Sequence, residues 1–142
     1  MQQNEIQIMK IRKSDYRFLY QLLKKRDPRA NISHRTMPTY TEHQKFVASK
    51  PYKAWYVIYA RKTKVGSIYL SRQNELGVFL LPKYQGKNIG QKALQLLMNT
   101  HAEKRYLANV NPKNTSSAKF FKKNKFKLIQ HTYEYIPGVE LE

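Results

Sequence analysis

The sequence contains no cysteine, and it has only nine acidic residues against 27 lysines and arginines. Without thiols, the chain cannot form a disulfide framework, a zinc knuckle, an iron–sulfur cluster or a cysteine nucleophile, and we expect no metal. No apolar run reaches the roughly 18 residues that a membrane-spanning helix requires. Residues 1–10 also lack the basic start and the apolar stretch of a secretory signal. We therefore expect a cytoplasmic protein without a membrane span.

The excess of positive charge, +18, is spread along the chain and is not gathered in a tail. Residues 1–71 contain 15 lysines and arginines, and residues 72–142 contain 12. Such a charge suits phosphate-bearing partners in general, from nucleic acids to nucleotides and phosphorylated cofactors. No RNP, KH or helix-turn-helix signature is present, which disfavours a nucleic-acid-binding module.

The 142 residues suit one domain, because 41% of them are hydrophobic and no linker or repeat divides the chain. In chain order we expect a strand within 5–12, a helix ending at 26, a helix over 39–50, strands over 54–61, 65–71 and 75–81, a helix over 89–101, a strand over 106–110, a helix over 115–124 and a last strand over 126–135. The sequence thus predicts a single mixed α/β domain over residues 1–142, with an antiparallel front half and a β-α-β-α-β back half.

The loop Gln85-Gly86-Lys87-Asn88-Ile89-Gly90 lies between an expected strand and an expected helix. Its glycines allow the backbone to turn tightly and to approach a ligand. The first amides of the following helix have no intrahelical acceptor and lie at the positive end of the helix dipole, so that phosphate is a natural ligand there. The loop is neither a Walker nor a Rossmann motif, and an ordinary connection remains the alternative.

A second polar motif, Asn111-Pro112-Lys113-Asn114, follows the next strand and precedes a helix that carries Ser117 and Phe120-Phe121. Through these two motifs and the order of the expected strands, nearly the whole chain resembles the GCN5-related N-acetyltransferase (GNAT) superfamily. The loop matches the Gln/Arg-x-x-Gly-x-Gly/Ala pattern of that family. The resemblance implies that acetyl-CoA is the cosubstrate and that it lies in a notch where the fourth and fifth strands splay apart.

The resemblance also implies which residues hold the cofactor. Pantetheine is expected to pair with the backbone of the fourth strand, and the pyrophosphate to lie on the amides of the glycine-containing loop. The residues implied in this way are Phe79, Leu80, Leu81, Gln85, Gly86, Lys87, Asn88, Ile89, Gly90, Gln91, Asn111, Asn114, Ser117 and Phe120. Asn114 has the alternative role of an ordinary helix N-cap.

Three positions depart from the family pattern. Asn88 stands where the family has glycine, and asparagine tolerates a left-handed backbone better than other side chains do. Phe121 replaces a tyrosine that serves as the acid for the departing thiolate, so that Tyr106, Tyr133 or water must take this role. Lys125 replaces the glycine before the last phenylalanine of the motif.

The attacking amine must be neutral, and the site therefore needs a base or a water path to one. Glu75, at the start of the fourth strand, is the best carboxylate among the few acids, with a salt-bridged strand-end role as the alternative. His43 is the second candidate for catalysis, with a helix-lining role as the alternative. The oxyanion is expected to meet a backbone amide near Phe79.

The acceptor pocket is expected between the first two helices and on the second and third strands. Arginine pairs well with phosphate, and aromatic faces stack on uracil or sugar rings. The substrate-binding candidates are Arg26, Asn31, His34, Arg35, Trp55 and Tyr69. Their pattern is similar to the GNAT branch that acetylates nucleotide-linked amino sugars.

We therefore expect an acetyl-CoA-dependent N-acetyltransferase that acts in a ternary complex on a primary amine. The expected partner is a small anionic amine, a nucleotide-linked amino sugar, and the charge of +18 argues against polyamines. The same chemistry on a protein N-terminus, a lysine or another small amine is the first alternative, and a non-enzymatic basic nucleic-acid-binding module is the second. The oligomeric state stays open, a homodimer included.

Overall fold

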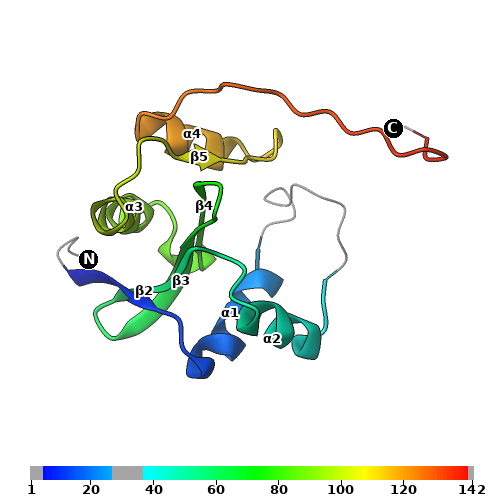
Figure 1. The fold of residues 1–142 in the computed structure, drawn as a ribbon. Coiled ribbons are helices and arrows are strands. Elements are labelled where there is room, and N and C mark those ends of the chain that lie inside the picture. The colour runs from blue at the N-terminus through cyan, green and yellow to red at the C-terminus, as the bar shows by residue number, and fades with distance from the viewer. Residues whose placement is uncertain (1–4, 27–36, 141–142) are drawn as a thin grey trace.

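Five strands form one sheet in the order β1-β2-β3-β4-β5 (Figure 1). The computed structural model describes residues 5–26 and 37–140. The strands are β1 (Ile6–Lys10), β2 (Ala54–Ala60), β3 (Thr63–Leu70), β4 (Glu75–Leu80) and β5 (Leu107–Ala108). The helices are α1 (Tyr16–Lys24), α2 (Tyr40–Ala48), α3 (Ile89–Thr100) and α4 (Thr115–Lys123), with short 3-10 turns η2 (Lys13–Asp15) and η4 (Pro82–Tyr84). In the described part of the chain, no helix has the length and apolarity that crossing a membrane requires.

The front half of the sheet, β1 to β4, is antiparallel, as the sequence predicts. Strand β5 then joins β4 in parallel, because α3 carries the chain back along the sheet. This parallel pairing covers two residue pairs, Glu75 with Leu107 and Leu76 with Ala108. Strand β4 continues to Leu80 without β5 beside it, and the two strands therefore part along most of the length of β4.

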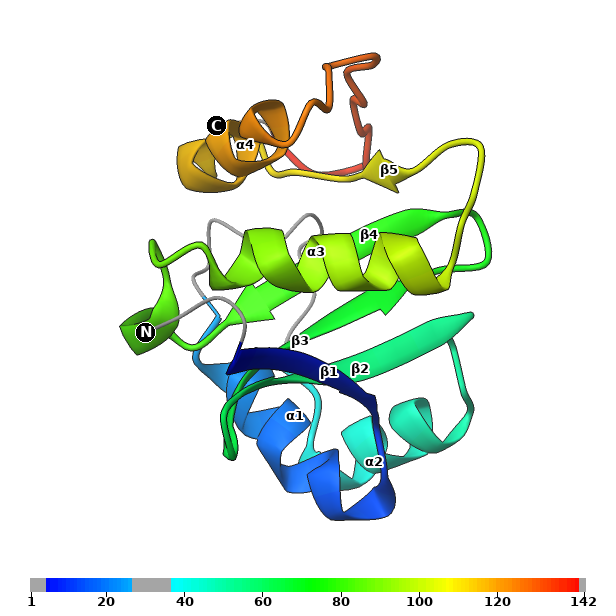
Figure 2. The same cartoon turned by 90° about the vertical axis from the view of Figure 1, so that its left-hand side faces the viewer.

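Helices cover both faces of the sheet, with α3 on one face and α1 and α2 on the other (Figure 2). The apolar residues of α3 recur at helical spacing, and they pack on the side chains that β2 and β3 present to the same face. This core contains Ile58, Ile68, Leu70, Ile89, Ala93, Leu94 and Leu97. On the opposite face Leu19, Leu22 and Val47 are buried. This packing holds α3 in place on the sheet beside β4.

The last predicted strand, 126–135, does not form. After α4 the chain turns through Lys125, whose φ of 72° is left-handed. This conformation explains why the family pattern has glycine at that position. Phe126 donates its backbone N–H to the carbonyl of Phe121 at 2.9 Å, and the following residues run along the outside. A strand needs a partner edge, which the residue pattern of one segment does not specify.

Candidate active site

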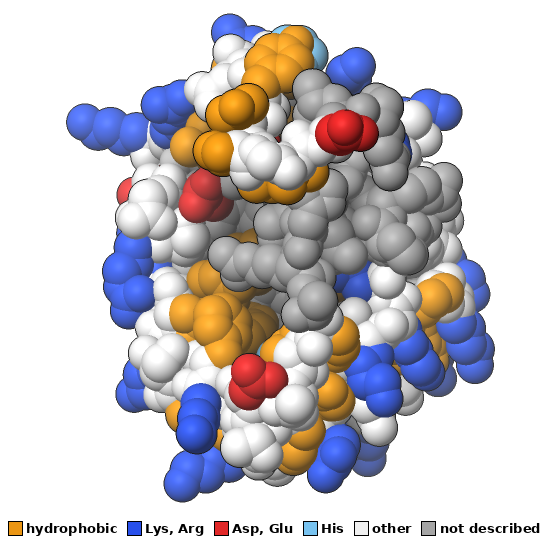
Figure 3. Space-filling model, turned by 90° about the vertical axis from the view of Figure 1, so that its right-hand side faces the viewer, with side chains coloured by type: hydrophobic (Ala, Val, Ile, Leu, Met, Phe, Trp, Pro, Cys, Tyr) orange, Lys and Arg blue, Asp and Glu red, His pale blue; other side chains and the backbone are white. Residues whose placement is uncertain are grey.

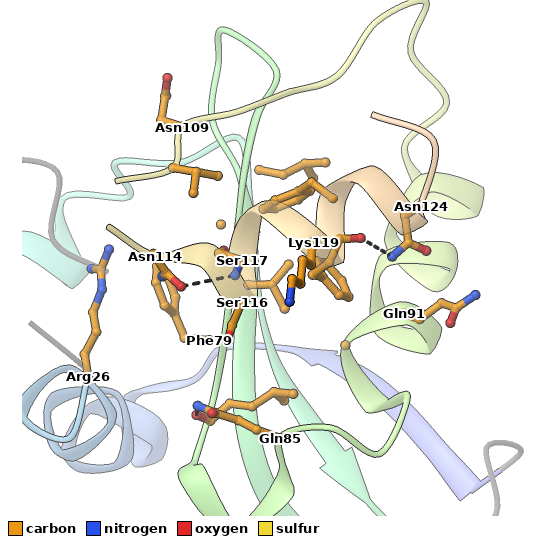
Figure 4. A pocket seen from close by; sticks show the side chains of 18 of the residues that line it. Arg26, Phe79, Gln85, Gln91, Asn109, Asn114, Ser116, Ser117, Lys119 and Asn124 are labelled. Carbon is orange, nitrogen blue, oxygen red and sulfur yellow. Dashed lines mark hydrogen bonds between the residues drawn. The ribbon is translucent and has the colours of Figure 1, made fainter. Parts of the chain in front are cut away.

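A cleft of about 650 Å³ opens where β4 and β5 part (Figure 4). Its walls are β4, the loop and first turn of α3, the start of α4, and the end of α1. Arg26 lies on one side of this opening, and Gln91 and Asn124 lie on the other (Figure 4). The cleft therefore has two ends, one beside α3 and α4 and one beside α1.

The α3 end of the cleft contains the glycine-containing loop at which we expect the pyrophosphate to bind. Asn88 is the N-cap of α3 with φ 64° and ψ 11°, the left-handed conformation that its position in the loop predicts. The Asn88 side chain makes no capping hydrogen bond, and the residues of the first turn, Ile89, Gly90 and Gln91, line the cleft. Amides that have no intrahelical acceptor therefore lie beside the cleft. The ammonium of Lys123 approaches the Asn88 side-chain oxygen at 3.4 Å and places a cation from α4 beside the loop.

The start of α4 forms the facing wall. The side-chain oxygen of Asn114 accepts a hydrogen bond from the Ser117 N–H at 3.1 Å, so Asn114 is an N-cap and lines the cleft at the same time. The side-chain oxygen of Asn111 accepts one from the Lys113 N–H at 2.9 Å. Open helix amides, nearby lysines and a cleft of this size fit the phosphates and the pantetheine arm of acetyl-CoA.

At the α1 end, four side chains form one stacked row. The guanidinium of Arg26 lies 4.1 Å from the centroid of the Phe79 ring. The Phe79 and Tyr69 centroids are 6.2 Å apart, and the Tyr69 and Tyr52 rings stack at 3.9 Å with an angle of 7° between them. Tyr69 can lie across β4 because Gly77 faces it, and a Cβ on Gly77 would come within 2.1 Å of the Tyr69 ring. The row places one cation and three aromatic rings along the wall of the cleft.

Charge and burial set the protonation of this row. Burial lowers the pKa of Arg26, an effect that the neighbouring Tyr69 and Tyr52 oppose. Burial raises the pKa of the Tyr69 hydroxyl, while Arg26 and a hydrogen bond with Tyr52 act in the opposite direction. Tyr69 is therefore a neutral phenol at neutral pH and Arg26 keeps its charge.

Glu75 supplies the carboxylate of the cleft. Its Oε2 accepts a hydrogen bond from the side-chain amide of Asn109 at 2.6 Å, and its Oε1 accepts one from the Ser71 hydroxyl at 3.3 Å. Asn109 also lines the cleft, directly after β5. The carboxylate is thus held at the closed end of the gap between β4 and β5, beside Tyr69.

The structure brings most of the predicted site residues together. The cleft is lined by Arg26, Tyr69, Glu75, Phe79, Leu80, Gln85, Gly86, Asn88, Ile89, Gly90, Gln91, Asn111, Asn114, Ser117 and Phe120. Leu81, Lys87, His43 and Trp55 do not line it. Asn31, His34 and Arg35 lie outside the described residues. Fewer of the predicted residues are therefore in place at the α1 end of the cleft, where we expect the acceptor (the acceptor end), than at the α3 end, where we expect the cofactor (the cofactor end).

His43 lies on the inner face of α2, away from Glu75. Its side chain is buried, its ring lies 5.4 Å from that of Tyr20 and 6.4 Å from that of Phe46, and burial lowers its pKa. Trp55 packs edge-on against Tyr52 at 4.8 Å. The helix-lining role that the sequence left open for His43 agrees with this position.

Sequence reasoning missed four residues that shape the acceptor end: Tyr52, Ser71, Gly77 and Asn109. Asn109 precedes the polar motif by two positions and could have been found as a further amide at the end of a strand. The facing of Gly77 and Tyr69 depends on the β3–β4 register, which a single strand does not reveal. Neither Tyr106 nor Tyr133, the expected substitutes for the missing acid, lines the cleft, and the tyrosines that do are Tyr52 and Tyr69.

Within the part of the chain that the structure describes, no group of histidine and acidic side chains could hold a metal ion. Tyr106 instead donates its hydroxyl to the carbonyl of His101 and accepts the N–H of Glu103. These bonds fix the chain just before β5. Among the described residues that line the cleft, Glu75 is the one carboxylate.

Known structures share this fold. A domain from Methanocaldococcus jannaschii superimposes with a TM-score of 0.76 at 23% identity, over 91% of this chain and 92% of that one. RimL, a ribosomal L7/L12 α-N-protein acetyltransferase solved with coenzyme A, gives 0.73 at 20% identity over 94% and 88%. An N-acetyltransferase from Staphylococcus aureus gives 0.69 at 20% identity over 86% and 83%. A comparison with curated proteins gives no significant match.

The model of the acetyltransferase (GNAT) family matches residues 9–126, a span that contains the cleft, its glycine-containing loop and the polar motif before α4. Acetyl-CoA is the cosubstrate of this family, in agreement with the open amides and lysines at the α3 end of the cleft. The chain belongs to the GNAT family of acetyl-CoA-dependent N-acetyltransferases.

Proposed function

We propose that the protein transfers the acetyl group of acetyl-CoA to a primary amine on an anionic amino sugar, specifically a nucleotide-linked one. The stacked row of Arg26, Phe79, Tyr69 and Tyr52 carries this proposal. An arginine can bind a phosphate through two parallel hydrogen bonds, and aromatic faces stack on a base or a sugar ring. A nucleotide-linked sugar offers both groups in one molecule.

The charges that line the cleft support an anionic acceptor. Among the described lining residues, four are cationic, and Glu75 is the single acid. The cations are Lys25, Arg26, Lys119 and Lys123. A polyamine would meet repulsion at both ends of such a cleft, whereas an anionic acceptor is attracted to it. Glu75 then interacts with the reacting amine, and the cations interact with the anionic part of the acceptor.

Acetyl-CoA supplies the acetyl group as a thioester. Glu75 accepts the proton of the acceptor's ammonium group, directly or through one water, so that the neutral amine can attack the thioester carbonyl. The C–S bond breaks as the amide C–N bond forms, and coenzyme A leaves as a thiolate. The second proton that the amine loses is taken up by water, and the thiolate takes its proton from water. Asn109 and Ser71 hold the carboxylate in one orientation while this proton moves. We expect Glu75→Gln to lower kcat by roughly 10²-fold or more, with acetyl-CoA affinity unchanged. A rate near that of the unmodified protein would assign the proton transfer to water.

The acceptor is tested with a panel of nucleotide-linked amino sugars, free amino sugars and peptide N-termini. We expect the first group to have the highest kcat/KM. Arg26→Ala should raise KM for that acceptor at least about tenfold, while KM for acetyl-CoA stays constant. Arg17→Ala is the matched control, because Arg17 lies on α1, the helix that Arg26 follows, and its guanidinium lies 3.9 Å from the centroid of the Tyr40 ring, outside the cleft. Preferred turnover of peptides, with no effect of Arg26→Ala, would overturn the assignment in favour of a protein acceptor.

A further inference from the structure

Arg72, on the turn between β3 and β4, holds the chain that leads into β2. Its Nη2 donates a hydrogen bond to the carbonyl of Lys50 at 2.9 Å, and its Nη1 donates one to the carbonyl of Pro51, also at 2.9 Å. The planar guanidinium thus joins two consecutive carbonyls through two separate N–H groups. Arg72 is exposed and does not line the cleft, so it does not itself contact a molecule bound there.

The bonds from Arg72 lie at the bend that leads to Tyr52. Lys50 has a left-handed backbone, with φ 53°, and Tyr52 comes two residues later. The β2–β3 ladder begins only at the pair of Ala54 with Leu70. Tyr52 therefore lies outside this ladder, and the two bonds from Arg72 tie its segment to the end of β3.

The ring of Tyr52 belongs to the stacked row at the acceptor end of the cleft. It stacks on Tyr69 with 3.9 Å between the centroids and 7° between the planes, and it meets Trp55 edge-on at 4.8 Å. Stacking at this distance depends on the position of both rings. A displacement of residues 50 and 51 would move the Tyr52 ring relative to Tyr69, and with it one aromatic ring of the cleft wall.

The same turn holds the carboxylate of Glu75. The hydroxyl of Ser71, the neighbour of Arg72, accepts the Glu75 backbone N–H at 2.9 Å and donates to Glu75 Oε1 at 3.3 Å. Adjacent residues of one turn therefore hold two parts of the site, Ser71 the carboxylate and Arg72 the segment before Tyr52. Because these contacts are separate, loss of the Arg72 side chain should leave the bonds to Glu75 in place.

We propose that Arg72 is a positioning residue for the acceptor and acts by holding the Tyr52 ring in the stacked row. The inference rests on the proposed function, in which this row binds the acceptor. Geometry and not charge carries the effect. The chain has 27 lysines and arginines, and those on the face in Figure 3 are spread over it, so that one exposed cation changes the field at the cleft little. Arg72→Lys keeps the charge but loses the planar fork that reaches both carbonyls.

Trp55 provides a readout of the Tyr52 position that needs no substrate. It is the single tryptophan of the chain, and its ring contacts that of Tyr52. Indole emission depends on the groups around the ring, so Arg72→Ala and Arg72→Lys should both change the emission spectrum in the direction that Tyr52→Ala does. Arg61→Ala is the matched control, because Arg61 bonds to Glu5 at 2.7 Å from the β2–β3 turn, at the opposite end of these strands, and should leave the emission unchanged.

Steady-state kinetics with the best acceptor of the panel gives the second measurement. Arg72→Ala and Arg72→Lys should raise the acceptor KM at least about fivefold, with kcat within about twofold and KM for acetyl-CoA unchanged. In a Tyr52→Ala background, Arg72→Ala should have little further effect on the acceptor KM. Unchanged Trp55 emission, an unchanged acceptor KM, or a KM that Arg72→Lys restores would each overturn the inference.

These measurements distinguish a failure of the inference from a failure of the proposed function. The kinetics use whichever acceptor class has the highest kcat/KM, so they do not require a nucleotide-linked sugar. An acceptor KM that rises in Tyr52→Ala and not in Arg72→Ala would overturn the inference alone. An acceptor KM that stays constant in both variants would mean that the stacked row does not bind the acceptor, and the proposed function would fail with the inference.

Discussion

The side-chain amide of Asn109 donates a hydrogen bond to the carboxylate of Glu75 beside the two residue pairs that join β4 to β5, with 2.6 Å between Nδ2 and Oε2. The Ser71 hydroxyl also donates to Oε1 of the same carboxylate, at 3.3 Å, and accepts the Glu75 backbone N–H at 2.9 Å. Residues from two separate positions in the chain thus orient one carboxylate, and Glu75, Asn109 and Ser71 all line the cleft.

Asn109→Ala should lower kcat about tenfold, because one hydrogen bond to a charged group is worth about 1.5 kcal/mol. Acetyl-CoA affinity should stay constant, since Asn109 lies at the end of the cleft away from α3. Asn109→Gln, which keeps the amide, should restore part of the rate. Steady-state kinetics with calorimetry of cofactor binding checks this. An unchanged kcat in Asn109→Ala would show that Asn109 does not position Glu75.

Gly77→Ala should raise KM for the acceptor at least about tenfold, because the new methyl group would displace the Tyr69 ring from its place across β4. The effects of Gly77→Ala and Tyr69→Ala on this KM should not be additive. In a Tyr69→Ala background the ring is gone, and Gly77→Ala should then have little further effect on KM. A double-mutant cycle measures this coupling. Additive losses would mean that Gly77 acts on the backbone of β4 and not through Tyr69.

Gly90→Val should weaken acetyl-CoA binding at least about tenfold. A Cβ at position 90 would lie 3.2 Å from Phe120 Cε1, and the larger valine must push this ring into the cleft. Gly90→Ala is the graded control, because its single methyl group requires a shift of only a few tenths of an ångström. Calorimetry on the folded variants provides the dissociation constants. Equal acetyl-CoA affinity in the unmodified protein, Gly90→Ala and Gly90→Val would show that the contact between Gly90 and Phe120 does not affect cofactor binding.

Burial of His43 should make stability fall in weak acid. Burial lowers the pKa of this side chain below the value of about 6.5 for free imidazole. The unfolded chain therefore binds more protons than the folded one as the pH falls through about 6.5, and the free energy of unfolding decreases. His43→Gln should make this decrease smaller between about pH 7.5 and 5.5. His131→Gln, a change on the exposed C-terminal segment, is the control for urea unfolding at each pH.

The cofactor end of the site was predictable because its parts are consecutive in sequence. The loop from Gln85 to Gly90 and the motif from Asn111 to Asn114 can each be recognised from consecutive residues. The loop lies between β4 and α3, and the motif lies between β5 and α4. Asn88 illustrates this, since its left-handed backbone follows from its residue type and its position before α3.

The acceptor end was less predictable, because its parts meet only through strand register and helix packing. Arg26 reaches Phe79 from a different layer of the domain, and Tyr69 faces Gly77 across a strand pair. His43 was a candidate because it is a titratable residue on a short helix, and the structure shows that its side chain is buried and does not line the cleft. The segment after Phe126 has the propensity of a strand, but propensity does not specify a partner.

The short seam between β4 and β5 has a consequence for the stability of the whole domain. Two residue pairs join β5 to the sheet, and the cleft separates β4 from α4 beyond them. A cosubstrate that binds in the cleft and contacts both β4 and α4 would therefore add contacts between the main sheet and the part of the chain that contains β5 and α4. Because it binds the folded chain alone, a hundredfold excess over its dissociation constant adds about 2.7 kcal/mol to the free energy of unfolding. Saturating acetyl-CoA should therefore stabilise the fold as well as supply the acetyl group.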